Sequence, residues 1–264
     1  MKLELREASS DGCALIGMVH LDPLSGSPGY RGSMKNILES ARRDAERLIE
    51  GGADALLIEN MGDLPYLRGQ VAPETTASMA VATFELARMG RPVGVQILAA
   101  ANLEALAVAV AAGASFIRAE AFAYAHVADE GWLDASAGLL LRARRNLGSE
   151  VSIWADVKKK HAAHAVTADL SIEDVSKGSV FCGADALVVT GRETGDPTSL
   201  EDVQAAARAG SPVLVGSGVT PAQARALRRE ASGVIVGSAL KDDGDWRKPV
   251  SVARVRALKE ALCA

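Results

Sequence analysis

The chain has 264 residues, of which 48% are hydrophobic and 23% are charged, and its formal net charge of -4 comes from 29 basic and 33 acidic residues. These proportions are ordinary for a globular protein, and the near balance of charge argues against a nucleic-acid partner held by phosphate neutralisation. Three cysteines are too few for a disulfide framework, and no apolar run reaches the ~20 residues that a membrane span needs. We therefore expect a cytoplasmic protein with no integral membrane segment.

Short apolar runs alternate with longer segments of helical period, a pattern typical of a parallel sheet built from βα units. The predicted strands are Cys13–His20, Ala53–Glu59, Pro92–Leu98, Ser115–Glu120, Glu150–Lys158, Ala184–Thr190, Pro212–Gly216 and Ser232–Gly237. The predicted helices are Lys35–Glu50, Glu74–Met89, Leu103–Ala112, Ala135–Leu147, Ile172–Val180, Leu200–Ala209, Pro221–Arg229 and Val252–Leu262. Eight such pairs favour one α/β domain over residues 1–264, a (β/α)8 TIM barrel. A doubly wound open sheet is the weaker alternative, because its Gly-x-Gly-x-x-Gly turn is absent after the first strand.

A glycine recurs at the entry of every second predicted strand. Gly52, Gly113 and Gly183 each end a predicted helix and are followed by Ala at the start of a strand. Glycine caps many helices that lead into strands, which explains each copy taken alone. The regular placement of the three copies fits a repeat of two βα units and supports the barrel.

Charged side chains gather at the predicted C-terminal ends of the strands, where TIM barrels place their chemistry. In the fifth predicted strand, two-residue alternation turns Trp154, Asp156 and Lys158 inward, so Asp156 and Lys158 are expected to share the barrel mouth. Buried charges are costly, so these groups either pair only with one another or form a substrate site. The candidate catalytic residues are His20, Glu59, Arg118, Glu120, Asp156 and Lys158.

Each candidate suggests a role through its chemistry. Asp156 and Glu59 are candidates for general acid or base catalysis, Arg118 for charge stabilisation and His20 for a proton donor or substrate contact. Lys158 is either a binder of phosphate or carboxylate, or a neutral nucleophile if burial lowers its pKa.

Two glycine-containing turns follow the seventh and eighth predicted strands. They are Gly216-Ser217-Gly218 and Gly237-Ser238. Backbone N–H groups in such turns can approach an anion closely, and these are the loops with which many barrels hold phosphate. The alternative is that the glycines serve only tight-turn geometry. Asn60 and Gln96, at the ends of the second and third predicted strands, are further candidates for substrate binding.

A metal site can be imagined from His161 and His164, three residues apart, or from His20 with Asp22. No second histidine stands beside His20, so we expect neither a metal nor another cofactor. His161 is expected to orient a loop or a substrate group.

Several segments resemble the BtpA/SgcQ family. They are Gly17-Met18-Val19-His20-Leu21-Asp22-Pro23-Leu24, Gly52–Asn60, Phe116-Ile117-Arg118, Ala155-Asp156-Val157 with Lys160-His161-Ala162, Thr190-Gly191, Thr194-Gly195 and the two glycine turns. The resemblance covers nearly the whole chain and implies a TIM barrel of the ribulose-phosphate-binding type, with Lys160, His161, Thr190 and Gly191 among its substrate-binding residues. One branch of the family is associated with photosystem I biogenesis and another with sugar-metabolism gene clusters. Glu120 and Lys158 depart from the family pattern, which often has Asn and His at these places.

Two hypotheses from different classes follow. The first is an enzyme that acts on a small phosphorylated metabolite, a sugar or nucleoside phosphate, by lyase, isomerase or transferase chemistry. The second is a barrel that binds a ligand without a reaction, or that serves as an assembly factor for a membrane complex such as photosystem I. A metal-dependent hydrolase ranks third. A homo-oligomer is expected because barrels often pair their helix faces.

Overall fold

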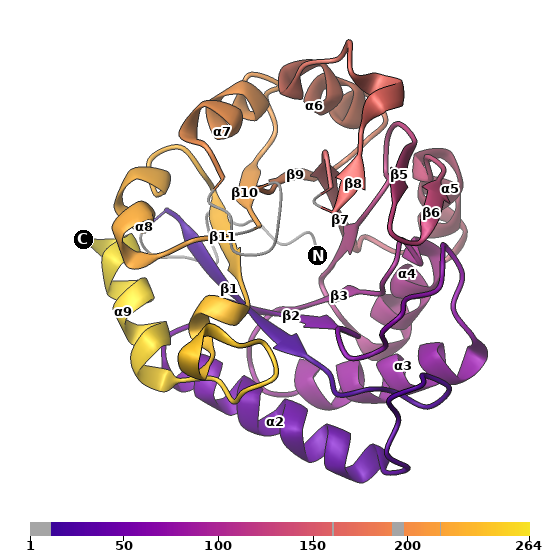
Figure 1. Ribbon diagram of the computed structural model, residues 1–264, viewed down its shortest axis with the longest axis vertical. Coiled ribbons are helices and arrows are strands. Elements are labelled where there is room, and N and C mark those ends of the chain that lie inside the picture. Colours follow the sequence, from indigo (N-terminus) through magenta and orange to yellow (C-terminus); the bar gives the residue numbers. More distant parts are fainter. Residues whose placement is uncertain (1–11, 160, 192–197, 217) are drawn as a thin grey trace.

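The computed structural model describes residues 12–159, 161–191, 198–216 and 218–264. Its central feature is a closed parallel barrel in the order β1-β2-β3-β4-β7-β9-β10-β11, with β11 pairing back to β1 (Figure 1). The barrel strands are β1 (Ala14–His20), β2 (Ala55–Glu59), β3 (Val93–Gln96), β4 (Phe116–Ala119), β7 (Ser152–Val157), β9 (Ala186–Val189), β10 (Val213–Val215) and β11 (Gly233–Val236). The eight predicted strands and the TIM-barrel class are confirmed.

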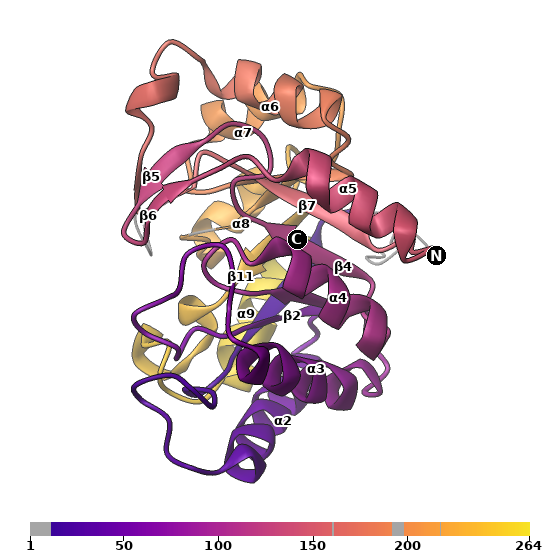
Figure 2. The ribbon, with the colours of Figure 1, turned by 90° about the vertical axis from the view of Figure 1, so that its right-hand side faces the viewer.

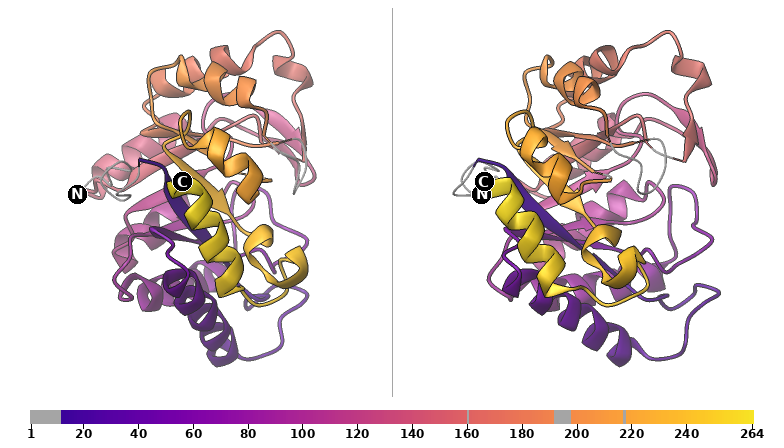
Figure 3. Two further views of the ribbon diagram at one scale, coloured as in Figure 1. Left: turned by 90° about the vertical axis from the view of Figure 1, so that its left-hand side faces the viewer. Right: turned by 60° about the vertical axis from the view of Figure 1, so that its left-hand side comes forward.

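A helix follows each barrel strand, and the helices encircle the barrel (Figures 1 and 3). Their bounds are α2 (Met34–Glu50), α3 (Pro73–Ala87), α4 (Asn102–Ala112), α5 (Ala137–Asn146), α6 (Ile172–Phe181), α7 (Leu200–Ala207), α8 (Pro221–Leu227) and α9 (Val252–Cys263). Local sequence fixes several helix starts. Ser33 caps α2 by accepting a hydrogen bond from the Asn36 amide, and Ser171 and Asp174 form a capping box at α6.

Side chains of the barrel strands alternate between two apolar layers. Ile153, Ala155 and Val157 pack in the layer between barrel and helices, whereas Trp154 belongs to the cluster inside the barrel. There the Trp154 ring stacks on Phe116 with 3.7 Å between ring centroids. Gly94 makes room for this pair, because a Cβ at that position would lie 2.0 Å from the Phe116 ring. The barrel interior is therefore filled, and only its end is open to a ligand.

A small antiparallel sheet was not predicted. The hairpin of β5 (His126–Ala128) and β6 (Gly131–Leu133) follows β4 and pairs with β8 (Ala162–Ala163), which follows β7. Figure 2 shows β5 and β6 projecting on the left of the barrel. Short 3-10 helices complete the loops: η1 (Ala165–Thr167), η2 (Ser238–Leu240) and η3 (Asp242–Gly244). The loops after β4 and β7 are thus joined into one structure beside the barrel mouth.

Candidate active site

A cavity of about 450 Å³ opens at the C-terminal ends of the barrel strands. Its walls contain ten of the predicted site residues: His20, Glu59, Gln96, Arg118, Glu120, His161, Gly216, Gly218, Gly237 and Ser238. Asn60, Asp156, Lys158, Thr190 and Gly191 do not line it. The predicted residues Ser217 and Lys160 lie outside the described residues, as does the Thr194-Gly195 segment. Ten of the predicted residues thus line one cavity at the barrel mouth, and five others in the described part of the chain lie outside its lining.

Arg118 and Asp156 form a buried ion pair on neighbouring strands, β4 and β7. Arg118 donates through Nε to Asp156 Oδ1 at 2.9 Å and through Nη2 to Oδ2 at 3.3 Å. Burial lowers the pKa of Arg118, but the Asp156 carboxylate outweighs this effect and the pKa rises above its ordinary value. The predicted role of Asp156 as a general acid or base in contact with substrate does not fit this position. Both of its oxygens hold the guanidinium, and it is Arg118 that faces the cavity.

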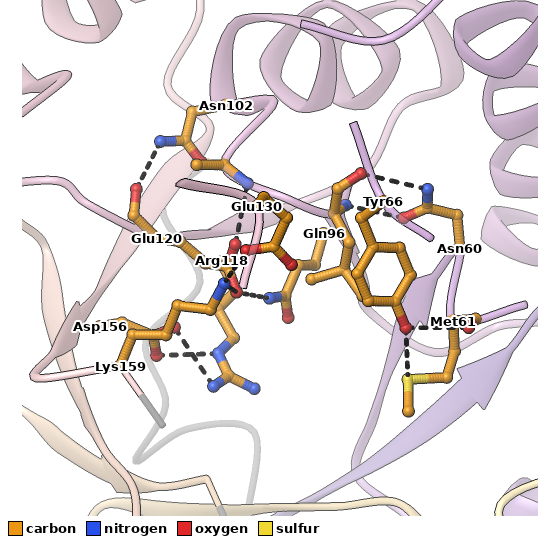
Figure 4. A network of polar contacts seen from close by, with 12 residues as sticks. Asn60, Met61, Tyr66, Gln96, Asn102, Arg118, Glu120, Glu130, Asp156 and Lys159 are labelled. Carbon is orange, nitrogen blue, oxygen red and sulfur yellow. Dashed lines mark hydrogen bonds and ion pairs between the residues drawn. The ribbon is translucent and has the colours of Figure 1, made fainter. Parts of the chain in front are cut away.

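Glu120 is a carboxyl group held in a buried setting just beyond β4. Its Oε2 accepts a hydrogen bond from the Ala100 amide at 2.8 Å, and its Oε1 accepts a longer one from Gln96 Nε2 at 3.4 Å (Figure 4). Burial raises the pKa of Glu120, and the ammonium group of Lys159, 3.5 Å from Oε1, offsets only part of this effect. A buried carboxyl group with a raised pKa is suited to proton transfer.

Lys159, not Lys158, supplies the ammonium group of the cavity, and this corrects the prediction. Lys158 has a positive φ of 55°, which breaks the strand alternation, and its Nζ donates to the Leu170 carbonyl at 2.8 Å. Lys159 instead turns into the mouth, where it also forms an ion pair with Glu130 of the hairpin at 3.3 Å (Figure 4). Burial lowers the pKa of Lys159, but the two carboxylates outweigh it and raise the pKa. Lys159 is therefore held as a charged ammonium group rather than as a neutral nucleophile.

His20 and Glu59 end neighbouring strands, β1 and β2, and are paired in register. His20 Nε2 lies 3.7 Å from Glu59 Oε2, with both side chains buried. The other edge of the histidine faces Trp246, with ring centroids 6.2 Å apart. The pair places an imidazole and a carboxylate side by side on one wall of the cavity, an arrangement suited to moving a proton.

The turns after β10 and β11 leave no space for side chains. A Cβ on Gly216 would lie 2.8 Å from Val188 and 3.5 Å from Nη2 of Arg118, and a Cβ on Gly237 would lie 2.6 Å from the His20 ring. Glycine is therefore required at both positions by close packing, beyond any need for a tight turn. The same closeness brings the Arg118 guanidinium beside the β10 turn, where an anion on that turn would meet a positive charge.

Part of the cavity wall is apolar and includes Met18, Met61 and Leu98. Tyr66 also lines it and donates its hydroxyl hydrogen to the Met61 carbonyl at 3.0 Å. Asn60, predicted as a substrate contact, instead fixes the backbone behind this wall: its Oδ1 accepts from the Leu98 amide at 2.7 Å, and its Nδ2 donates to Asp63 at 3.0 Å. Sequence reasoning placed Asn60 at the end of the second predicted strand but had no means of finding its hydrogen-bond partners.

Gln96 carries a polar atom that the protein leaves unused. Its side chain is 2% exposed, and its Nε2 donates to Glu120. Its Oε1 is buried and has no hydrogen-bond partner within residues 12–159, 161–191, 198–216 and 218–264. Because a buried acceptor is stabilised by a hydrogen bond, Gln96 Oε1 is suited to accept one from a hydroxyl or N–H group of a ligand.

Two further observations concern the described part of the chain. It contains no cluster of three or more His, Cys, Asp or Glu side chains arranged to hold a metal ion. In the same part, no helix combines the length and the apolar character that crossing a bilayer requires.

The chain belongs to the BtpA family, whose family model matches residues 12–263. It is 35% identical over 254 residues to the photosystem I biogenesis protein BtpA of Synechocystis sp., covering 94% of this chain and 87% of that protein. An uncharacterized mitochondrial protein of Caenorhabditis elegans is 43% identical over 249 residues, covering 91% of this chain and 90% of that one.

Several solved structures share this barrel fold at low sequence identity. KGPDC from Streptococcus mutans has a TM-score of 0.60 at 12% identity and covers 95% of this chain and 97% of its own. Thiamine phosphate pyrophosphorylase from Pyrococcus furiosus has a TM-score of 0.57 at 18% identity and covers 96% of both chains. At these identities the likeness establishes the fold alone.

Proposed function

We propose that this protein is an enzyme that acts on a small phosphorylated metabolite, a sugar or nucleoside phosphate, at the C-terminal face of the barrel. One observation carries the proposal. A single cavity joins the two glycine turns, the Arg118 guanidinium, and the carboxyl groups of Glu59 and Glu120. Barrels commonly hold phosphate on the loops after these two strands. Two solved structures with this fold, thiamine phosphate pyrophosphorylase and phosphoribosyl anthranilate isomerase, are named for phosphorylated compounds.

The cavity supports proton-transfer chemistry of the isomerase or lyase type. Backbone N–H groups at Gly218 and Gly237 would hold the phosphate, whereas the Gly216 N–H donates to the Val189 carbonyl at 2.8 Å. Arg118 would lie beside the phosphate and offset negative charge in the transition state. Glu120 would act as the acid, because burial raises its pKa. Glu59 with His20 would take up or return the proton elsewhere in the same cavity.

The unused Oε1 atom of Gln96 supports a substrate with a hydroxyl or N–H donor near the acid. A phosphorylated sugar offers such donors, whereas inorganic phosphate reaches only the anion-binding turns. A Gln96→Leu variant is therefore expected to weaken binding of hydroxyl-bearing phosphates by roughly tenfold, since a buried hydrogen bond and its desolvation amount to about 1–3 kcal/mol. Its affinity for inorganic phosphate should change little.

Thermal unfolding against a ligand panel tests the proposal. The panel contains sugar phosphates, nucleotides, nucleosides, unphosphorylated sugars and inorganic phosphate. A ligand at 100 times its Kd adds about 2.7 kcal/mol of stability, which shifts the midpoint of a chain of this size by roughly 5–10 °C. The proposal expects a shift with phosphorylated compounds and none with the matching unphosphorylated sugars. A panel without any shift would contradict it.

A binding or assembly factor is the second candidate, and one feature favours it. Exposed apolar side chains surround the mouth: Leu64 and Leu67 lie on the loop after β2, and Val127 and Trp132 pair across the hairpin. Arg68 links the two groups by donating to the Trp132 carbonyl. Such a patch can bind another protein. The biogenesis name of the Synechocystis relative points the same way. Binding of phosphorylated compounds without turnover would favour this candidate.

A further inference from the structure

A second cavity, of about 660 Å³, lies beside the first. One wall is formed by the loop after β1 and by residues 36–47 of α2. The other wall is the loop of residues 241–250 after β11, which Figure 1 shows beside α2. His20 lines both cavities, and Trp246, which lines only the second, meets the edge of the His20 ring. The two residues form the partition between the cavities.

The walls of this second cavity carry an excess of positive charge. Two acidic side chains, Asp22 and Asp44, line it, against six basic ones: Arg31, Arg43, Arg47, Lys241, Arg247 and Lys248. Three of these bases already have carboxylate partners, because Lys241 pairs with Asp44, Arg247 with Asp245 and Lys248 with Asp243. Arg47 donates to the Val250 carbonyl at 3.4 Å, which supplies no compensating charge.

Arg31 and Arg43 are the two remaining basic side chains among the six that line this cavity. Both are exposed to the cavity, and neither has an ion pair or hydrogen bond with any other residue in the part of the chain that the structure describes. Asp22 remains as the one lining carboxylate without a base of its own among these residues. Arg31, Arg43 and Arg47 thus outnumber it, and the cavity is electropositive.

The donors on α2 are arranged as an elongated row. Ser33, Asn36, Ser40, Arg43 and Arg47 recur at intervals of three and four residues, so they share one face of the helix, and all line the cavity. At 1.5 Å per residue the row is about 20 Å long. A single phosphate spans only a small part of such a row. A ligand with two or more linked phosphoryl groups matches both its length and its charge.

We propose that this cavity is a second anion-binding site, which takes a ligand with a diphosphate or longer phosphoryl chain. Arg31 and Arg43 bind the phosphoryl oxygens from the α2 side, and the loop of residues 241–250 closes over them. A cavity between two walls fits a small molecule better than a nucleic-acid strand, which needs a longer open surface. The proposal does not depend on the proposed reaction, because Arg31 and Arg43 do not line the first cavity.

Inorganic pyrophosphate is the probe, titrated into the full chain and followed by calorimetry and by tryptophan fluorescence. The variant is Arg43→Ala, and the matched control is Arg42→Ala on the same helix, where Arg42 pairs with Glu46 outside the cavity. Alanine is the best helix former, so both variants should fold. We expect pyrophosphate to bind at least about tenfold more weakly to Arg43→Ala than to Arg42→Ala, and weaker still to the Arg31→Ala/Arg43→Ala variant. A Trp246→Phe variant should lose the fluorescence change while keeping the calorimetric signal.

Two results would overturn the proposal: equal affinities in Arg43→Ala and Arg42→Ala, or no binding to the parent chain at millimolar pyrophosphate. A short RNA that binds through Arg43 more tightly than pyrophosphate would also overturn the proposal, because the ligand of the cavity would then be a nucleic acid and not a small molecule. These outcomes are distinct from failure of the proposed reaction. The first cavity is probed separately by sugar phosphates and Gln96→Leu.

Discussion

Arg118 and Asp156 meet side by side across β4 and β7, with two hydrogen bonds in the pair and both side chains at most 5% exposed. The guanidinium is held rigidly and turned toward the glycine of the β10 turn. A buried ion pair of this kind adds little net stability, because desolvation offsets the attraction, but it fixes the position of the charge. Asp156 is therefore best understood as a positioning residue for Arg118.

Removal of one partner tests this role. Asp156→Asn leaves the Arg118 charge buried without a counterion, and we expect the free energy of unfolding to fall by about 3–5 kcal/mol in denaturant titrations. The double variant Arg118→Met/Asp156→Leu removes both charges and should recover much of that loss. Ligand binding should be weak in both proteins, since neither presents a correctly held guanidinium. If the double variant were as unstable as the sum of its single variants, the two residues would not act as a pair.

Lys158 and Lys159 provide a matched pair of substitutions. Lys159→Met removes the ammonium group that lies against Glu120 and Glu130, so we expect binding of phosphorylated ligands to weaken by about tenfold or more. Lys158→Met removes a hydrogen bond to the Leu170 carbonyl and should cost about 1 kcal/mol of stability without a change in ligand affinity. Affinities measured by calorimetry decide the assignment. A larger loss of affinity in Lys158→Met than in Lys159→Met would restore Lys158 to the site.

These two lysines mark where sequence reasoning reached its limit. Two-residue alternation correctly predicted that Trp154 and Asp156 turn into the barrel, because a continuous strand fixes that period. It failed at Lys158, since a positive φ in a residue other than glycine is uncommon and has no clear sequence signal. Eight strands and their helices were predictable because short apolar runs alternate in the sequence with longer segments of helical period. Which polar side chains pair with one another depends on neighbours far away in the chain.

The hairpin illustrates a different limit. Strands of three residues, such as β5 and β6, are too short to show a period, and their alanine and glycine content suggests a loop. The turn residue Gly131, with a φ of 106°, was the available signal, because glycine after two acidic residues favours a turn. Glu130 and Lys159 were consequently missed as partners, although their charges were visible in the sequence.

Gly237→Ala tests whether the β11 turn holds the anion. The added methyl group would press against the His20 ring, so we expect the thermal shift with phosphorylated ligands to be lost. The matched control is Gly138→Ala in α5, where a Cβ would lie 3.4 Å from Arg142. Because Gly138 lies at an exposed position in the helix, the Gly138→Ala protein should gain up to about 1 kcal/mol of stability and keep the full thermal shift with ligand. A Gly237→Ala protein with an unchanged ligand shift would place the anion elsewhere.

His126, buried at the start of β5, makes stability depend on pH. Burial lowers its pKa to about 4, and nearby His164 and Lys159 add to the effect. Between its unfolded pKa of about 6.5 and this value, the unfolded chain binds a proton that the folded chain does not, so stability falls as the pH falls. The contribution lost between pH 7.5 and pH 5 is about 2 kcal/mol. In His126→Gln, which cannot take up a proton, the difference in unfolding free energy between these two pH values should be smaller by that amount. Urea titrations of both proteins at pH 5 and pH 7.5 give the comparison, and an identical pH dependence would mean that His126 is protonated in the folded state as readily as in the unfolded one.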